Sequence, residues 1–125
     1  MSAFGIRGMM AFGCLLLALA IAGEAVAAHA LPGRVEPALV ERFARAMRYL
    51  VIHGLASIAL ATVLRTPAQR IAYATVLLGA LLFCFSLSLS VFWPDAGITR
   101  IAPMGGGLMI LGWLALGVTL LLQRR

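Results

Sequence analysis

Residues 41–58 read ERFARAMRYLVIHGLASI, and this stretch decides how the chain folds. Its first eight residues carry Glu41 and three arginines, whereas the next ten are apolar except for Tyr49, His53 and Ser57. The apolar positions recur every three or four residues, which predicts a helix. A charged amphipathic lead-in therefore continues without a break into a segment that suits a membrane, and this segment carries a histidine into apolar surroundings.

The composition of the whole chain is that of an integral membrane protein. Of its 125 residues, 63% are hydrophobic and 11% are charged, and the mean hydropathy is +1.06. A soluble domain could not present such a surface to water without aggregating. The length allows one compact membrane domain, residues 1–125, and no separate soluble domain.

The charges and the cysteines narrow the class further. The ten basic residues are all arginine, the formal charge is +6, and the arginines lie mostly at the ends of apolar runs. This distribution predicts anchoring at lipid headgroups, with the bilayer as partner, rather than nucleic-acid binding, which needs a continuous basic face. Cys14 and Cys84 fall inside apolar runs without Cys-x-x-Cys spacing, so we expect two small buried hydrophobic side chains.

Four apolar runs predict four membrane helices, at residues 9–31, 38–65, 70–93 and 101–122. The first would rise about 34 Å, enough to cross a hydrocarbon core of roughly 30 Å. Prolines and glycines separate the runs and leave only short turns between them. We therefore predict an all-α fold, an antiparallel up-and-down four-helix bundle with the amphipathic lead-in at the start of its second helix.

The first run also has an alternative interpretation. Arg7, the apolar residues after it and Ala25-Val26-Ala27 resemble a secretory signal with an Ala-x-Ala cleavage site. Cleavage there would leave a mature chain that begins at Ala28. The residues alone leave both interpretations open, and the intact mass of the protein distinguishes them.

Four spans place both termini on the same side of the membrane. The arginines divide equally, five to each side, but Arg42, Arg45 and Arg48 belong to the lead-in, which we expect to lie along or enter the interface. When these three arginines are left out of the count of basic residues in the loops, the side of the termini has more arginines, and the positive-inside rule favours cytoplasmic termini. We expect a multi-pass protein of the bacterial inner (plasma) membrane with both termini in the cytoplasm.

Polar side chains within the apolar runs are costly in hydrocarbon and are therefore the candidates for a site. On the second helix they repeat every four residues, which predicts one stripe pointing into the bundle. Because the first two helices run antiparallel through a short turn, we expect His29 and His53 at similar depth. The predicted polar cluster comprises Glu24, His29, Arg45, Tyr49, His53 and Ser57.

Three interpretations of this cluster remain open. The favoured one is structural, with the side chains bonded across helices so that they fix one packing of the bundle. The second is a proton relay or substrate path in a small transporter or channel. The third is a haem or metal bound by the two histidines, a weak signal because only two ligands are present. We expect no catalytic residue, no metal and no cofactor, and therefore no enzyme.

Other residues are expected to serve helix packing. The glycine run at residues 105–107 lacks the lysine and the preceding strand of a phosphate loop, so it more simply allows close helix approach. The serines of the third helix lack a Gly-x-Ser-x-Gly context. The predicted packing residues are Ser86, Pro103, Gly105, Gly106, Gly112 and Trp113. We expect the bundle to act as an accessory component, in a larger membrane complex or as a homo-oligomer.

Four short motifs occur in order along the chain. They are Ala28-His29 with Leu31, Arg48-Tyr49 with His53 and Leu55, Leu82-Phe83 with Ser86, and Pro103-Met104-Gly105-Gly106 followed by Gly112-Trp113. Together they resemble the YgdD-like family of small membrane proteins, a domain-of-unknown-function family with bacterial and eukaryotic members. The resemblance extends from about Gly13 to the end of the chain. It implies a four-helix inner-membrane protein whose activity is not established.

The chain also departs from the pattern of that family. Glu24, Ala27 and Phe85 stand where the family has glycines, so the resemblance implies that the carboxylate of Glu24 is not part of the family pattern. The family motif includes Ala28-His29 together with the helix before it. The resemblance therefore implies that the first helix is retained rather than cleaved.

Overall fold

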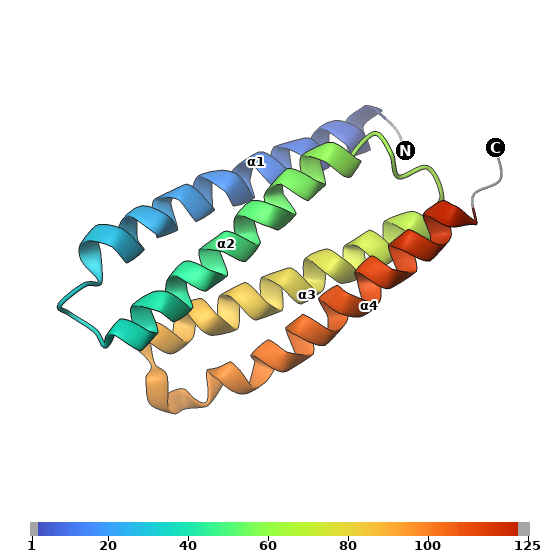
Figure 1. Cartoon of the computed structure of the whole chain (residues 1–125). Helices are drawn as coiled ribbons and strands as arrows, with labels where there is room; N and C mark the ends of the chain where they lie inside the picture. Colours follow the sequence, from blue (N-terminus) through green and yellow to red (C-terminus); the bar gives the residue numbers. More distant parts are fainter. Residues whose placement is uncertain (1–2, 123–125) are drawn as a thin grey trace.

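The computed structural model describes residues 3–122 of the chain. Its elements are α1 (Ala3–Ala25), a π-helical turn (Val26–Ala30), α2 (Pro37–Leu60), α3 (Pro67–Phe92), two 3-10 turns (Pro94–Ala96 and Ile98–Ile101) and α4 (Ala102–Leu121). The four helices run alternately up and down (Figure 1). This arrangement confirms the predicted all-α fold. Arg124 and Arg125, two of the arginines counted on the side of the termini, lie outside the described residues.

Each of the four helices is long and apolar enough to cross a membrane. The longest, α3, has 26 residues and rises about 39 Å, against a hydrocarbon core of roughly 30 Å. The start of α1 and the end of α4 lie at one end of the bundle, and the α1–α2 and α3–α4 connections lie at the other (Figure 1). The charged lead-in belongs to α2 itself, which is one continuous helix from Pro37.

Local sequence signals set where the helices begin and end. Pro37 and Pro67 occupy the first turns of α2 and α3, where their missing N–H groups cost nothing. Thr66 and Gln69 form a capping box at the start of α3: the Gln69 backbone N–H donates to the Thr66 hydroxyl, and the Gln69 side-chain oxygen Oε1 accepts from the Thr66 backbone N–H. Helix α2 ends at Leu60 rather than at the predicted residue 65, because residues 61–63 turn towards this cap.

The bundle consists of two tight helix pairs joined through α2 and α3. Helix α1 packs along α2, and α3 packs along α4 (Figure 1). Within the described residues, α1 and α4 make no extended contact with each other. The outer surfaces of these two helices are accordingly the most exposed: Leu15, Ile21 and Leu114 each keep more than 60% of their surface uncovered.

Glycines allow the closest approach within each pair. A Cβ placed on Gly13 would lie 2.6 Å from the Gly54 carbonyl oxygen of α2. A Cβ placed on Gly105 would lie 2.6 Å from both the Gly79 carbonyl oxygen and the Phe83 nitrogen of α3. Because these neighbours are backbone atoms, they could yield only if the helices moved apart. The two contacts therefore fix the register of α1 on α2 and of α4 on α3.

The cysteines have different environments. Cys84 is buried as predicted, and its thiol donates to the Ala46 carbonyl 3.2 Å away on α2. The prediction for Cys14 was wrong, because Cys14 lies on the exposed outer face of α1. The first helix is apolar around its whole circumference, so the sequence does not indicate which of its residues face the bundle.

The Gly79–Gly105 contact gives a prediction with a matched control on the same helix. Gly105→Ala should lower the free energy of unfolding by about 1–3 kcal/mol, because the added methyl group overlaps backbone atoms of α3. Gly107→Ala should leave stability unchanged or raise it, since a Cβ there meets nothing within 4 Å and alanine favours helix. Unfolding in mixed detergent measures both. Equal effects of the two substitutions would contradict the packing described here.

Candidate functional site around His53

The polar residues of α2 do not form a straight inward stripe. Arg45 is exposed, Tyr49 is half-buried, and His53 and Ser57 are buried, with 2% and 0% of their surfaces exposed. Residues four apart on an α-helix are rotated by about 40° relative to each other, so the row turns through about 120° over three steps. The row therefore begins on the outside of the bundle and ends inside it, which corrects the predicted inward stripe.

His53 is held by its own helix. Its Nδ1 lies 2.7 Å from the Tyr49 carbonyl oxygen, which can only accept, so Nδ1 carries a proton and donates. The imidazole ring also stacks on the Tyr49 ring, with centroids 6.3 Å apart and an interplanar angle of 14°. These two contacts set the orientation of the ring.

The backbone of His53 takes part in a second set of hydrogen bonds. The hydroxyls of Ser57 and Tyr73 lie 2.9 Å apart, and they donate to the His53 carbonyl oxygen over 2.8 and 3.2 Å respectively. Tyr73 belongs to the second turn of α3 and Ser57 to the last turn of α2, so this group links the two helices near the connection between them. Serine on a membrane helix normally bonds back to its own backbone, and here Tyr73 extends that bond across helices.

Aromatic rings from three helices surround the imidazole. Trp113 of α4 lies 6.2 Å from His53 and 6.0 Å from Tyr73, measured between ring centroids, and Phe83 of α3 lies 4.8 Å from Tyr49. Beside them is an open pocket of about 480 Å³ between α2, α3 and α4. We call it the His53 pocket; the residues that line it are Tyr49, Ile52, His53, Phe83, Gly106, Met109, Ile110, Trp113 and Leu114.

The second nitrogen of the ring, Nε2, is buried and has no hydrogen-bond partner. With Nδ1 donating to Tyr49, the neutral imidazole leaves Nε2 with a free lone pair that can accept a hydrogen bond. A buried polar atom without a partner is uncommon, because the lost hydration is not replaced. The His53 pocket therefore joins apolar aromatic walls to one unsatisfied acceptor.

His29 and Glu24 do not join this site. The Gly13–Gly54 contact places His53 level with the residues just after Gly13 on α1, so His29 lies about 20 Å farther along the bundle axis. His29 is exposed and Glu24 is half-buried, and no hydrogen bond or ion pair within the described residues involves either side chain. The prediction of similar depth for the two histidines was wrong, because His53 is the seventeenth residue of α2 whereas His29 stands next to the turn.

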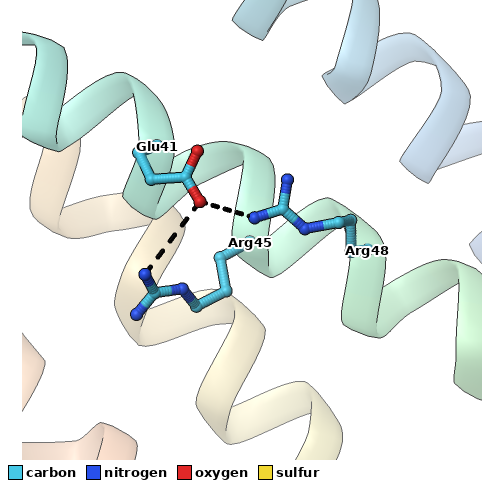
Figure 2. Close-up of polar contacts among 3 residues, drawn as sticks. All are labelled: Glu41, Arg45 and Arg48. Atoms are coloured by element: carbon cyan, nitrogen blue, oxygen red, sulfur yellow. Dashed lines mark hydrogen bonds and ion pairs between the residues drawn. The ribbon is translucent and has the colours of Figure 1, made fainter.

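Arg45 belongs to a separate charged group at the start of α2. Glu41 accepts a hydrogen bond from Arg48 over 2.6 Å and lies 4.0 Å from Arg45 (Figure 2). All three side chains are more than half exposed, so these ion pairs contribute little to folding where water reaches them. Figure 2 shows the two arginine side chains turned towards the Glu41 carboxylate along α2.

The predicted packing residues fall into three groups. Gly105 and Gly112 lie against α3: a Cβ on Gly112 would come within 2.8 Å of the Val76 nitrogen. Gly106 does not, since a Cβ there would meet nothing within 4 Å, and it lines the His53 pocket instead. Buried Ser86 bonds to the Phe83 carbonyl within α3, exposed Pro103 stands in the first turn of α4, and Trp113 borders His53.

Tyr73 and Phe83 belong to this site but were not predicted from the sequence. Phe83 appeared only in a family motif, and Tyr73 was not singled out. A tyrosine in the interior of an apolar run is a usable signal, because its buried hydroxyl needs a partner. Among the described residues, no group of three or more His, Cys, Asp and Glu side chains could hold a metal ion.

Comparison with known proteins identifies the family. Residues 22–106 match the model of the family described as "Protein of unknown function (DUF423)". The chain belongs to the DUF423 family. The matched segment runs from the end of α1 into the first turns of α4, and it contains His53, Tyr73 and Gly106. It therefore spans most of the site.

Three staphylococcal proteins are similar to this DUF423 chain, and each is called a UPF0382 membrane protein. The Staphylococcus aureus protein is 29% identical over 106 residues, covering 83% of this chain and 87% of the relative. The Staphylococcus epidermidis protein is 29% identical over 111 residues, which cover 87% of this chain and 91% of the relative. The Staphylococcus haemolyticus protein is 28% identical over 106 residues. No solved structure matches. The chain is thus a small membrane protein of a family whose activity is not established.

The two tyrosines of the chain give a paired prediction. Tyr73→Phe should lower the free energy of unfolding by about 1 kcal/mol, because it removes the hydroxyl that bonds Ser57 and the His53 carbonyl. Tyr49→Phe is the control, since no hydrogen bond of the Tyr49 hydroxyl occurs within the described residues. Unfolding in detergent compares the variants, and a larger loss for Tyr49→Phe would contradict this description of the site.

Proposed function

We propose that the chain is a non-catalytic structural or accessory component of the membrane rather than an enzyme. The observation that carries this proposal is the use of its buried polar side chains. The buried hydroxyl and thiol groups of Ser57, Tyr73, Cys84, Ser86 and Ser90 bond to backbone carbonyls or to one another, and several of these bonds join α2 to α3. Their geometry is that of a scaffold held in one register.

The bonds between α2 and α3 support this proposal most directly. Tyr73 and Ser57 join the two helices near the α2–α3 connection, and the Cys84 thiol donates to the Ala46 carbonyl about three turns farther along, towards the charged end of α2. Arg42 donates to the Ser90 hydroxyl over 3.3 Å at the charged end. Because α1 and α4 barely touch, the two helix pairs depend on this α2–α3 seam.

The main alternative is a small proton-linked transporter or channel. Such a protein needs titratable groups spaced closely enough to pass a proton or line a path. The separation of Glu24 and His29 from His53 counts against that alternative. A haem or metal shared by the two histidines is disfavoured for the same reason.

The outer faces of α1 and α4 suggest how an accessory protein would associate with others. These faces are apolar and lie uncovered at opposite edges of the bundle, with Leu19 on α1 and Leu111 on α4 exposed by 58% and 63%. We propose that α1 contacts a larger membrane complex. A photo-reactive residue at position 19 should cross-link to another membrane protein in intact cells; cross-links to lipid alone would contradict this.

We also propose that the chain is a YgdD-like member of its family, lies in the bacterial inner membrane and has both termini in the cytoplasm. The four sequence motifs support the first assignment. The shared end of the bundle at which α1 begins and α4 ends carries Arg7, Arg65 and Arg70 and none of the acidic residues of the chain, which supports the orientation. A C-terminal reporter that is active only outside the cytoplasm should stay inactive.

The scaffold proposal gives an expected result in reconstituted vesicles. Proteoliposomes under an imposed pH gradient and membrane potential should show no proton flux above that of empty vesicles, because the titratable groups are not connected. Glu24→Gln and His53→Ala should leave this result unchanged. A flux that the wild-type protein supports and either substitution abolishes would overturn the proposal in favour of the transporter.

A further inference from the structure

We infer that the His53 pocket binds a membrane-soluble aromatic alcohol, a flat apolar ring whose hydroxyl donates a hydrogen bond to His53 Nε2. This binding site goes beyond the scaffold role and does not depend on it. Three features of the pocket carry the inference: an unsatisfied acceptor, aromatic walls and an opening towards lipid.

The unsatisfied acceptor, His53 Nε2, requires a ligand that carries a hydrogen-bond donor. His53 is 2% exposed and its Nδ1 is committed to the Tyr49 carbonyl, so Nε2 is a fixed lone pair without a partner. A carbonyl or ether could not bond to it, because both only accept. A hydroxyl can donate, and a neutral one enters an apolar site at far lower cost than an ammonium group.

The aromatic walls of the pocket favour a ligand with a flat apolar ring. Tyr49, Phe83 and Trp113 present rings around His53, and a flat ring can pack edge-to-face or offset against them. The volume of about 480 Å³ is within the range of small-molecule sites. Because Nε2 is itself buried, this binding requires the indole of Trp113, which is 37% exposed, to turn outward and admit the hydroxyl.

The opening of the pocket indicates how a ligand would enter it. Ile52, Ile110 and Leu114 line the pocket and are themselves 54%, 63% and 63% exposed on surfaces that face the membrane. A ligand therefore enters sideways from hydrocarbon rather than from water. Gly106 leaves room at the wall, because its missing side chain keeps that space open.

The chain offers a direct spectroscopic test, since His29 and His53 are its only histidines. Protein labelled with ¹⁵N-histidine and held in detergent is titrated with 2-naphthol, and separately with 2-methoxynaphthalene, which has the same rings but no donor. We expect 2-naphthol to move the His53 Nε2 resonance upfield in a saturable manner and to leave that of His29 unchanged. The ether should bind at least about fivefold more weakly, the equivalent of one hydrogen bond of about 1 kcal/mol.

Two glycine variants separate binding from folding. Gly106→Leu should fill the pocket and abolish the His53 shift, whereas Gly107→Leu, whose side chain also starts in open space but does not line the pocket, should keep it. The inference is overturned if 2-naphthol leaves His53 Nε2 unmoved, if the ether acts as well as the alcohol, or if Gly106→Leu responds like wild type.

Two sources could supply such a ring in a membrane, a prenylated hydroquinone and an unprenylated phenol. Competition against 2-naphthol distinguishes them. A prenylated hydroquinone that displaces the probe at lower concentration than its unprenylated counterpart indicates that the isoprenoid tail lies along Ile110 and Leu114. Equal displacement indicates that the headgroup alone is recognised.

Discussion

Two close backbone contacts constrain the whole bundle. One joins α1 to α2 at Gly13 and Gly54, and the other joins α3 to α4 at Gly79 and Gly105. In hydrocarbon, helices gain little from burying apolar surface, because lipid tails are equally apolar, so close packing and hydrogen bonds must hold them together. Small residues permit that packing. Each contact also fixes one axial register, and the register decides which side chains meet.

The position of His53 follows from this register. It stands one residue before Gly54, so the contact with Gly13 places it in the middle of the bundle and leaves its ring to face α3 and α4. Tyr73 and Trp113 reach it from those helices. The same contact leaves His29 beside the turn, in a different layer. The structure thus has one intramembrane histidine site instead of the predicted pair, and that site has a buried, unused acceptor beside an apolar pocket.

The sequence predicted the fold well, since four long apolar runs separated by prolines and glycines leave few alternatives. It predicted the site less well. A four-residue repeat suggests a straight stripe, whereas the rotation accumulated between Arg45 and Ser57 carries that row from the surface to the core. Helices α1, α3 and α4 are apolar on all sides, so no amphipathic pattern shows which face is inward. The sequence can mark Tyr73 and Trp113 as notable residues, but only the packed helices show that their rings, with that of Phe83, gather around Tyr49 and His53.

The most direct test of the register is disulfide formation between introduced cysteines, in a chain whose own Cys14 and Cys84 are replaced by serine. Gly23 packs against the Met47 side chain, so the pair Gly23→Cys and Met47→Cys should oxidise readily and become protected from a maleimide reagent. The pair His29→Cys and His53→Cys should remain reduced and reactive, because about 20 Å separates the two positions along the bundle axis. Oxidation of the second pair, with the first still reactive, would contradict the register and the site built on it.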